Sequence, residues 1–572
     1  MISLNLGRVD LEECFIVKVT VLKCALVKFN QYHTARSNVQ RIIEFIKTGQ
    51  FENAKKEIRL TDGSGQFVQL MQLWFNEAMA QSQPEHALYA ITKLQKLFPE
   101  NPQYTSLFEQ LLTHLERYEE LVAFLETKKA KSLNDIFNLG FYSRKAALAN
   151  KSIQYFEQAL EKGITDPHEV YLNLALVYSE QLRDDAKAIE MLNKSLSLKP
   201  NYVSALHNLA NLKEQHGLAS EAQVLFEQIL SLEPDNVVAL ARLSDLNIFD
   251  LPKALSYEKT VLSALQRNQT NPNAIDLLYG LGKVFDDAKH YDQAWHYYVQ
   301  ANQANKQTLP QYEKQWYEEL ITDCKTREFK IKPIDTDLEP IIVCGMFRSG
   351  STLIERLIGA SGEVGIGGEI AFLHRHFFAK STSELMATLN ERKLLESYAR
   401  ELRQVAGNHE KVTDKRPENF MYVDLVKALF PQAKFVWTRR NKFDNALSAY
   451  FQRLGPTQNY ATDLDDILHY YQFQEHMLHV WQSKFPDTIH VVDYDELVNE
   501  PKGVGSALFN FLGLEYCNEH ETFHQMAGGV KTASVWQVRR PLYAQSSGRI
   551  ENYRDSILNC DLYSQFSSQL RN

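Results

Sequence analysis

The chain has 572 residues, carries a formal net charge of -9 at pH 7, and is 44% hydrophobic by composition. A single hydrophobic core stops growing near about 250–300 residues, so this length predicts more than one domain. The acidic balance excludes a general nucleic-acid-binding protein, whose footprint would be a strongly basic domain. Any anion site in this chain must therefore be local.

The six cysteines are scattered along the chain, with no Cys-x-x-Cys pair. They are Cys14, Cys24, Cys324, Cys344, Cys517 and Cys560. The histidine pairs His374/His376 and His476/His479 have no carboxylate or cysteine partner at a matching spacing. This usage predicts a reducing compartment and no metal site.

The N-terminal 36 residues contain an apolar stretch, 14–29, that is interrupted by Lys18, Lys23 and Lys28. A membrane span needs about 18 or more nearly uncharged residues, and the apolar region of a signal peptide tolerates no such lysines. The sequence therefore predicts a cytoplasmic protein without a membrane span. Residues 1–36 match nothing that follows, so we treat them as an extension of unknown role.

Residues 37–330 carry an internal repeat. Leu-Lys-Pro-Asn at 198–201 recurs as Leu-Glu-Pro-Asp at 232–235, which is a period of 34 residues. Small residues recur 12 positions after Gly140, Ala210 and Gly282, aromatic residues recur 16 positions after them, and Ala159, Ile229 and Ala301 stand 19 positions after them. The repeat that starts at Ala175 has one inserted residue. This pattern resembles the tetratricopeptide repeat, which is a helical solenoid. The resemblance implies a concave face that recruits a peptide or protein partner.

The pattern changes after the segment KIKPIDTDLEP (330–340), whose prolines and polar residues are typical of a linker. Short apolar runs at 340–344, 434–438 and 488–494 then alternate with helix-like segments. This order predicts an α/β domain with a parallel sheet over 338–572. Ligands in such sheets bind at the carboxyl ends of the strands.

The first of these runs is followed by GMFRSGST (345–352), which almost matches a nucleotide-binding P-loop. Gly345 and Gly350 have the right spacing, but Ser351 stands where the lysine of a P-loop would be. Arg348 offers a planar guanidinium instead of a point charge. The pattern predicts an anion held by backbone N–H groups at a helix start, without a metal partner. Thr352 and Glu355 also have the spacing of a capping box.

Three segments together resemble sulfotransferases: PIIVCGMFRSGSTLIERLI (340–358), GGE (367–369) and TRRNKFDNALSAYFQR (438–453). By pattern, the chain is similar to bacterial tetratricopeptide-sulfotransferase fusions and, in its second domain, to tyrosylprotein sulfotransferases. The resemblance implies 3'-phosphoadenosine 5'-phosphosulfate (PAPS) as donor, adenosine 3',5'-bisphosphate (PAP) as product, and no metal.

The resemblance also implies two sets of donor-binding residues. Those that would hold the 5'-phosphosulfate are Arg348, Ser349, Gly350, Ser351 and Thr352. Those that would contact the 3'-phosphate and the base are Arg440, Ser448, Tyr494 and Arg549. The family's usual Arg-Asp-Pro-Arg run is Arg440-Asn441-Lys442-Phe443 here, which leaves Lys442 as the cation that could compensate. Phe347 replaces the usual proline of the loop.

For catalysis, the resemblance implies Glu369 as the base that takes the acceptor's proton and Lys415 as the cation at the leaving oxygen. Arg348 and Ser534 would stabilise the transition state. Other roles stay open: Glu369 could cap a helix, Lys415 could pair with Asp414 or Glu418, and Ser534 could lie in a turn. Arg539 and Arg540 are expected on a solvated charged face.

The sequence thus predicts a helical solenoid followed by a P-loop-like α/β domain that transfers a sulfuryl group to a hydroxyl acceptor, such as a peptide tyrosine. The alternative is a tetratricopeptide adaptor with a catalytically weak, nucleotide-binding domain, which the substitutions at 441–443 would suggest. A P-loop kinase is disfavoured by the missing lysine. Peptide, glycan, lipid and small-molecule acceptors all remain open, and no sequence feature specifies an oligomeric state.

Overall fold

The computed structural model describes residues 35–58, 67–128, 130–380, 382–525, 537–539 and 547–571. The chain divides into two compact units, Met1–Ala205 and Leu206–Asn572. Nearly all of the N-terminal extension lies outside the described residues. None of the described helices has the length and apolar character that crossing a membrane requires.

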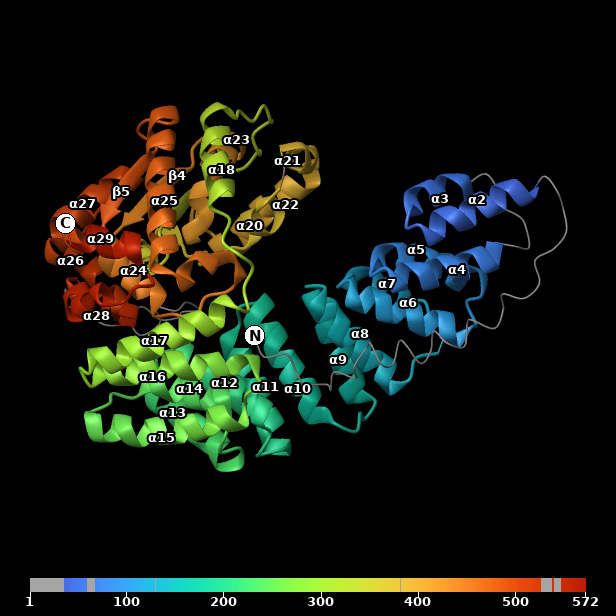
Figure 1. Cartoon of the computed structure of the whole chain (residues 1–572), viewed down its shortest axis with the longest axis horizontal. Helices are drawn as coiled ribbons and strands as arrows, with labels where there is room; N and C mark the ends of the chain where they lie inside the picture. Colours follow the sequence, from blue (N-terminus) through green and yellow to red (C-terminus); the bar gives the residue numbers. More distant parts are fainter. Residues whose placement is uncertain are drawn as a thin grey trace. The chain divides into compact units, whose positions relative to one another are not determined.

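The first unit is built of antiparallel helix pairs (Figure 1). Its helices are α2 (Ala35–Lys47), α3 (Phe51–Ile58), α4 (Phe67–Ala80), α5 (Pro84–Leu97), α6 (Pro102–His114), α7 (Tyr118–Glu126), α8 (Leu133–Lys145), α9 (Ala149–Glu161), α10 (Pro167–Leu176) and α11 (Asp185–Leu198). A π-helical segment, Val177–Gln181, continues α10. A π-turn holds one residue more than an α-turn, so it accommodates the residue inserted into this repeat.

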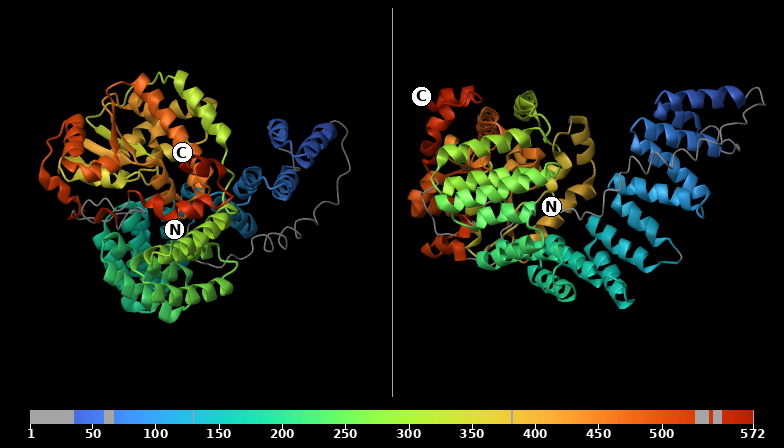
Figure 2. Two further views of the ribbon diagram at one scale, coloured as in Figure 1. Left: turned by 60° about the vertical axis from the view of Figure 1, so that its left-hand side comes forward. Right: turned by 60° about the horizontal axis from the view of Figure 1, so that its bottom comes forward.

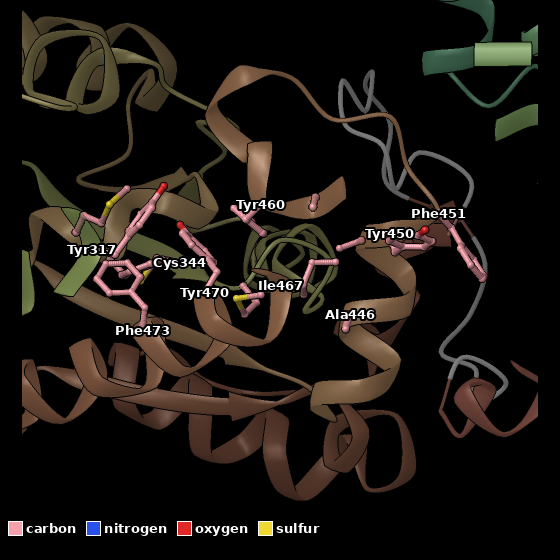
Figure 3. Close-up of a cluster of buried hydrophobic side chains, with 14 of the residues drawn as sticks. Tyr317, Cys344, Ala446, Tyr450, Phe451, Tyr460, Ile467, Tyr470 and Phe473 are labelled. Carbon is pink, nitrogen blue, oxygen red and sulfur yellow. The ribbon is translucent and has the colours of Figure 1, made fainter. Parts of the chain in front are cut away.

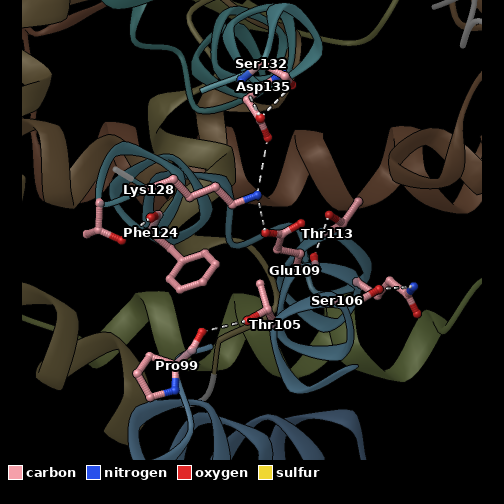
Figure 4. A network of polar contacts seen from close by, with 11 residues as sticks. Pro99, Thr105, Ser106, Glu109, Thr113, Phe124, Lys128, Ser132 and Asp135 are labelled. Atoms are coloured by element: carbon pink, nitrogen blue, oxygen red, sulfur yellow. Dashed lines mark hydrogen bonds and ion pairs between the residues drawn. The ribbon is translucent and has the colours of Figure 1, made fainter. Parts of the chain in front are cut away.

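Polar contacts join successive pairs in this unit. Lys128 Nζ lies 2.9 Å from Glu109 Oε1 and 3.4 Å from Asp135 Oδ1 (Figure 4). Asp135 and Ser132 form the capping box that begins α8. One ammonium group therefore links α6 to the start of α8, and the capping box satisfies N–H groups that the helix leaves unpaired.

The second unit begins with the remaining repeats, and its early helices are α12 (Val203–Gln215), α13 (Ala219–Leu232), α14 (Val237–Leu246), α15 (Leu251–Arg267), α16 (Ile275–Asp287), α17 (Tyr291–Lys306) and α18 (Lys314–Thr326). The predicted spacing of small and aromatic residues has a direct cause. A Cβ atom on Gly282 would lie 2.6 Å from the Tyr298 ring, and one on Gly140 would lie 2.7 Å from the Phe156 ring. The aromatic residue 16 positions on fills the space that the glycine leaves.

A parallel sheet follows, as predicted, and it has five described strands, of which three were predicted. Its strands are β1 (Glu339–Gly345), β2 (Val364–Gly365), β3 (Lys411–Lys415), β4 (Lys434–Arg439) and β5 (Ile489–Asp493), in the order β2-β3-β1-β4-β5. Val343 is in register with Lys415, and Gly345 with Thr438. The carboxyl ends of β1, β3 and β4 therefore meet at one edge of the sheet, where the expected site residues follow.

Helices cover both faces of this sheet (Figure 2). The described helices of this domain are α19 (Ser351–Gly359), α20 (Phe372–Phe377), α21 (Thr382–Leu389), α22 (Arg392–Ala406), α23 (Val423–Leu429), α24 (Lys442–Tyr450), α25 (Leu464–Lys484), α26 (Tyr494–Asn499), α27 (Pro501–Leu512), α28 (Arg554–Leu558) and α29 (Ser564–Arg571), and not all of them contact the sheet. Along β1, Ile342 and Cys344 face one hydrophobic cluster, whereas Ile341 and Val343 face another. Burial on both faces explains why this strand is a continuous apolar run.

The larger cluster extends from the sheet domain into the last repeat. Figure 3 shows part of this cluster within the sheet domain. Tyr298 of α17 stacks on Phe451, with ring centroids 3.7 Å apart and an interplanar angle of 9°. Asn302, also on α17, donates a hydrogen bond from Nδ2 to the carbonyl of Tyr450 at 2.8 Å. The last repeat and the sheet domain thus share one core. A domain division at 330–338 remains a prediction from composition.

We expect Gly282→Ala to destabilise the protein by about 1–3 kcal/mol, because the new methyl group would overlap a Tyr298 ring that Phe451 already holds. Gly503→Ala in α27 is the matched control. A Cβ there meets nothing within 4 Å, so alanine's better helix propensity should stabilise by about 0.5–1 kcal/mol. Thermal unfolding compares the two variants. Equal midpoints would contradict the packing role of Gly282.

Candidate active site

The loop between β1 and α19 is shaped by two glycines. Gly345 has a φ of +138°, and a Cβ there would lie 2.3 Å from the carbonyl oxygen of Thr438. Gly350 has a φ of +96°, and a Cβ there would lie 2.7 Å from the Tyr494 ring. Larger residues would therefore push the loop away from β4 and α26. Arg348, with a φ of +68°, adopts the left-handed conformation without being glycine.

Ser349 holds the loop to the neighbouring strand. Its Oγ donates to the carbonyl of Met346 at 2.6 Å and lies 2.5 Å from Thr438 Oγ1. The side chain is fully buried. In this conformation the Ser349 side chain points toward β4 and stabilises the loop. Its contact with a donor stays a prediction.

The predicted capping box at the start of α19 is wrong. Gly350 is the N-cap residue and supplies no side-chain hydrogen bond. Glu355 lies 3% exposed and instead accepts hydrogen bonds from Gly368 N at 2.9 Å and Thr413 Oγ1 at 2.6 Å. Burial raises the pKa of its carboxyl group. Glu355 therefore ties α19 to the GGE segment. The N-cap residue Gly350 offers the first N–H groups of the helix no side-chain hydrogen bond, and such groups suit an anion.

Predicted donor-binding residues from three segments meet beside this loop. Arg348 donates from Nε to Ser448 Oγ at 3.2 Å, and Arg440 donates from Nη1 to the carbonyl of Arg348 at 3.4 Å. The Arg440 guanidinium lies over the Tyr494 ring, 5.1 Å from its centroid. Ser448 is on α24, and Tyr494 begins α26. The structure thus brings these four residues together, although Arg348 and Ser448 are 100 positions apart in sequence.

Sequence reasoning missed Asn445, which also fixes the loop. Its Nδ2 donates to the carbonyl of Phe347 at 3.0 Å. Asn445 is one turn before Ser448 on α24, so the helix contacts the loop at both positions. Lys442, expected to compensate for the family arginine, donates to Gln569 Oε1 at 2.8 Å. Only the helical spacing of Asn445 from Ser448 could have indicated its role.

Lys415 and Glu369 form an ion pair, with Nζ 2.6 Å from Oε1. The Lys415 side chain is 1% exposed, whereas that of Glu369 is 38% exposed. Asp414 and Glu418, the alternative partners expected for Lys415, have other hydrogen bonds. Asp414 accepts one from Tyr398, and Glu418 accepts one from Gln458. A buried cation therefore orients a carboxylate that solvent can reach.

Other predicted residues have different partners. Arg549 donates from Nη2 to Asp286 Oδ2 on α16 and lies over the Phe451 ring, 5.2 Å from its centroid. Arg539 was expected on a solvated face, but it donates to the carbonyl of Gln215, and burial lowers its pKa. Ser534 and Arg540 lie outside the described residues, so their predicted roles stay predictions.

The comparisons with known proteins concern both parts of the chain. Residues 340–518 match the model of the sulfotransferase family, and residues 168–202 match a tetratricopeptide repeat. Within the C-terminal domain, residues 340–518 are thus similar to the sulfotransferase family. Both halves of the sequence-based resemblance are thereby confirmed, although the similarity to tyrosylprotein sulfotransferases in particular stays a prediction.

The chain is also similar, at low sequence identity, to individual proteins and solved structures. An uncharacterised protein of Aquifex aeolicus is 26% identical over 473 residues, which are 77% of this chain and 61% of the relative; the chain thus spans less than two thirds of that protein. The sulfotransferase domain of the Synechococcus PCC 7002 olefin synthase is 17% identical, with a TM-score of 0.30 over 43% of this chain and 96% of its own. A tetratricopeptide repeat protein from Parabacteroides merdae is 15% identical, with a TM-score of 0.28 over 45% and 97%.

Beside Lys415, the burial of Asp414 predicts a pH-dependent stability for the sheet domain. Burial raises the pKa of Asp414 to about 7, and the hydrogen bond that Tyr398 donates at 2.6 Å only partly offsets this effect. Because the folded pKa exceeds the unfolded value of 3.8, the protonated carboxyl stabilises the fold below about pH 4. This contribution is lost as the pH rises to about 7.

We expect Asp414→Asn to gain stability relative to wild type by about 2–3 kcal/mol between pH 5 and pH 8, since each pKa unit is worth about 1.36 kcal/mol. Asparagine can still accept the hydrogen bond from Tyr398 and never becomes charged. Thermal midpoints at both pH values provide the measurement, with the exposed Asp561→Asn as control. A pH-independent difference between wild type and Asp414→Asn would rule out the buried titration.

Proposed function

We propose that this chain transfers a sulfuryl group from PAPS to a hydroxyl acceptor, with peptide tyrosine as the favoured acceptor class. The observation that carries the proposal is the register of the sheet. It brings the carboxyl ends of β1, β3 and β4 together, and with them the loop, the Glu369–Lys415 pair and the Arg348–Ser448 contact. Sulfotransferase activity in general is supported by the family match over 340–518.

The residues at this edge of the sheet suit a donor that has an anionic group at each of two ends. The N-terminus of α19 offers uncapped N–H groups, and Arg348 and Arg440 supply guanidinium groups in an otherwise acidic chain. In our proposal, Arg348, Gly350, Ser351 and Thr352 hold the 5'-phosphosulfate end. The 3'-phosphate end is held by Arg440 and Ser448, and the base by Tyr494. When bound, PAPS supplies the activated sulfuryl group.

Glu369 is the group that can take a proton from the acceptor. Lys415 occupies Oε1, and Oε2 accepts no hydrogen bond from the described residues. Oε2 is therefore available to an acceptor hydroxyl within hydrogen-bonding reach. Because Lys415 is buried and Glu369 is partly exposed, the ammonium group orients the carboxylate and adds positive charge where the transferred group would pass.

Tetratricopeptide repeats generally mediate protein interactions, so we propose that the array presents a peptide or protein acceptor to this site. The acceptor hydroxyl of a peptide would then reach Glu369 from the exposed side.

Calorimetric titration tests the donor assignment. We expect PAP to bind more tightly than ATP, because only PAP carries the 3'-phosphate that Arg440 and Ser448 would pair. Ser448→Ala should weaken PAP binding about tenfold, in line with the loss of a hydrogen bond to a charged group. Tighter binding of ATP would overturn the sulfotransferase assignment, and no binding of either nucleotide would favour an adaptor.

Glu369→Gln tests the catalytic base. The amide keeps the shape of the side chain but cannot accept a proton, so we expect PAPS-dependent sulfation of a tyrosine peptide library to fall by about 10²–10⁴-fold. PAP binding should stay close to wild type. Glu363→Gln, which lies on an exposed loop before the same segment, is the matched control. Equal sulfation rates in Glu369→Gln and wild type would remove Glu369 as the base.

A further inference from the structure

Two side chains of the sulfotransferase domain converge on one carboxylate of the last repeat. Asp286 of α16 accepts hydrogen bonds from Arg549 through Oδ2 and from Tyr553 through Oδ1. Both donors belong to the 3₁₀-helical segment Arg549–Tyr553. The Asp286 side chain is 15% exposed, so this is a partly buried ion pair. One residue of the repeats therefore holds both ends of that segment.

The same segment is attached to α24 from its other side. Asp444 accepts hydrogen bonds from Gly548 N at 2.5 Å and from Ile550 N at 2.8 Å. Asp444 is 3% exposed and lies in the first turn of α24. Residues 548–553 thus bridge α16 to the helix that carries Asn445 and Ser448.

Arg549 is close to the donor-binding face of α24. Its guanidinium lies over Phe451, which follows Ser448 by three residues and so neighbours it on the helix surface. Ser448 in turn contacts Arg348. Arg549 contacts Asp286 through Nη2 and also pairs with Tyr553, which leaves some of the five N–H donors of the arginine for another acceptor. The Arg549 side chain is 34% exposed, so it is not sealed from solvent.

We propose that Asp286 is a positioning residue for Arg549, so that the last repeat completes the donor site of the sulfotransferase domain. The proposal rests on the function proposed above and on the sequence-based expectation that Arg549 contacts the 3'-phosphate side of the nucleotide. Asp286 fixes the guanidinium over Phe451 before the donor binds, which lowers the ordering cost of binding. The repeats then have a second role beside recruitment: they set the affinity for the donor.

Asp286→Asn in the full-length chain tests this role. The amide keeps the size of the side chain but loses the charge that orients Arg549. We expect PAP affinity, measured by calorimetry, to fall about 5–10-fold, and the KM for PAPS to rise while the KM for a peptide acceptor is unchanged. Asp292→Asn is the matched control, because Asp292 also joins the repeats to the sulfotransferase domain, through Ser556 Oγ at 2.6 Å, without contacting Arg549.

A double-mutant cycle with Arg549→Gln separates positioning from a structural effect. If Asp286 acts through Arg549, adding Asp286→Asn to Arg549→Gln should weaken PAP binding no further. Additive losses would show that Asp286 acts independently and would overturn the proposal. Asp286→Glu, which restores the charge, should recover part of the affinity even if Asp286→Asn lowers the thermal midpoint.

The remaining outcomes distinguish this proposal from the proposed function. If wild type binds no PAP, the function fails. If wild type binds PAP and Asp286→Asn binds it as Asp292→Asn does, only the positioning role fails. Tighter binding by Asp286→Asn would mean that the carboxylate competes with the phosphate for Arg549, which also overturns the proposal.

Discussion

The candidate site depends on the close approach of two strands at Gly345. Its backbone passes so near to Thr438 that a side chain could not fit. Because β1 and β4 touch at this point, Ser349 can reach Thr438, and the loop that follows is fixed against the sheet. Arg348 then extends toward α24, where Ser448 Oγ accepts a hydrogen bond from its Nε. If β1 and β4 were farther apart at Gly345, Ser349 could not reach Thr438, and the loop would lose this contact with the sheet.

Parallel topology explains why much of this site could be predicted from the sequence. Apolar runs identify the central strands, and ligand-binding residues follow the carboxyl ends of parallel strands. The loop at 345–352, Arg440 and Lys415 each follow or end such a strand, so their meeting required only that β1, β3 and β4 be neighbours. The short strands β2 and β3 were not predicted. The two residues of β2 are too few to form an apolar run, and most of the five residues of β3 are polar.

Residues whose partners are set by tertiary packing could not be predicted. Thr352 and Glu355 have the local spacing of a capping box, but Gly350 takes the cap position and Glu355 turns to Thr413, 58 residues away. Asp286 and Arg549 are 263 residues apart. No local pattern encodes such pairs, since their geometry arises only after the repeats and the sheet domain share a core. Local rules also fail at Arg348, whose left-handed backbone no sequence pattern here requires.

That shared core changes how the two parts of the chain should be regarded. In a solenoid each repeat contacts its neighbours, and the terminal repeats are caps with a polar outer face. Here the outer face of the last repeat is not polar: Tyr298 stacks on Phe451 and Trp295 on Tyr450, both at the end of α24. The sheet domain therefore acts as the cap of the solenoid. Conversely, a cut at the linker would expose this aromatic surface and remove the packing partners of the helix that holds Ser448, so the smallest unit that keeps the sheet domain's core intact begins within the repeats.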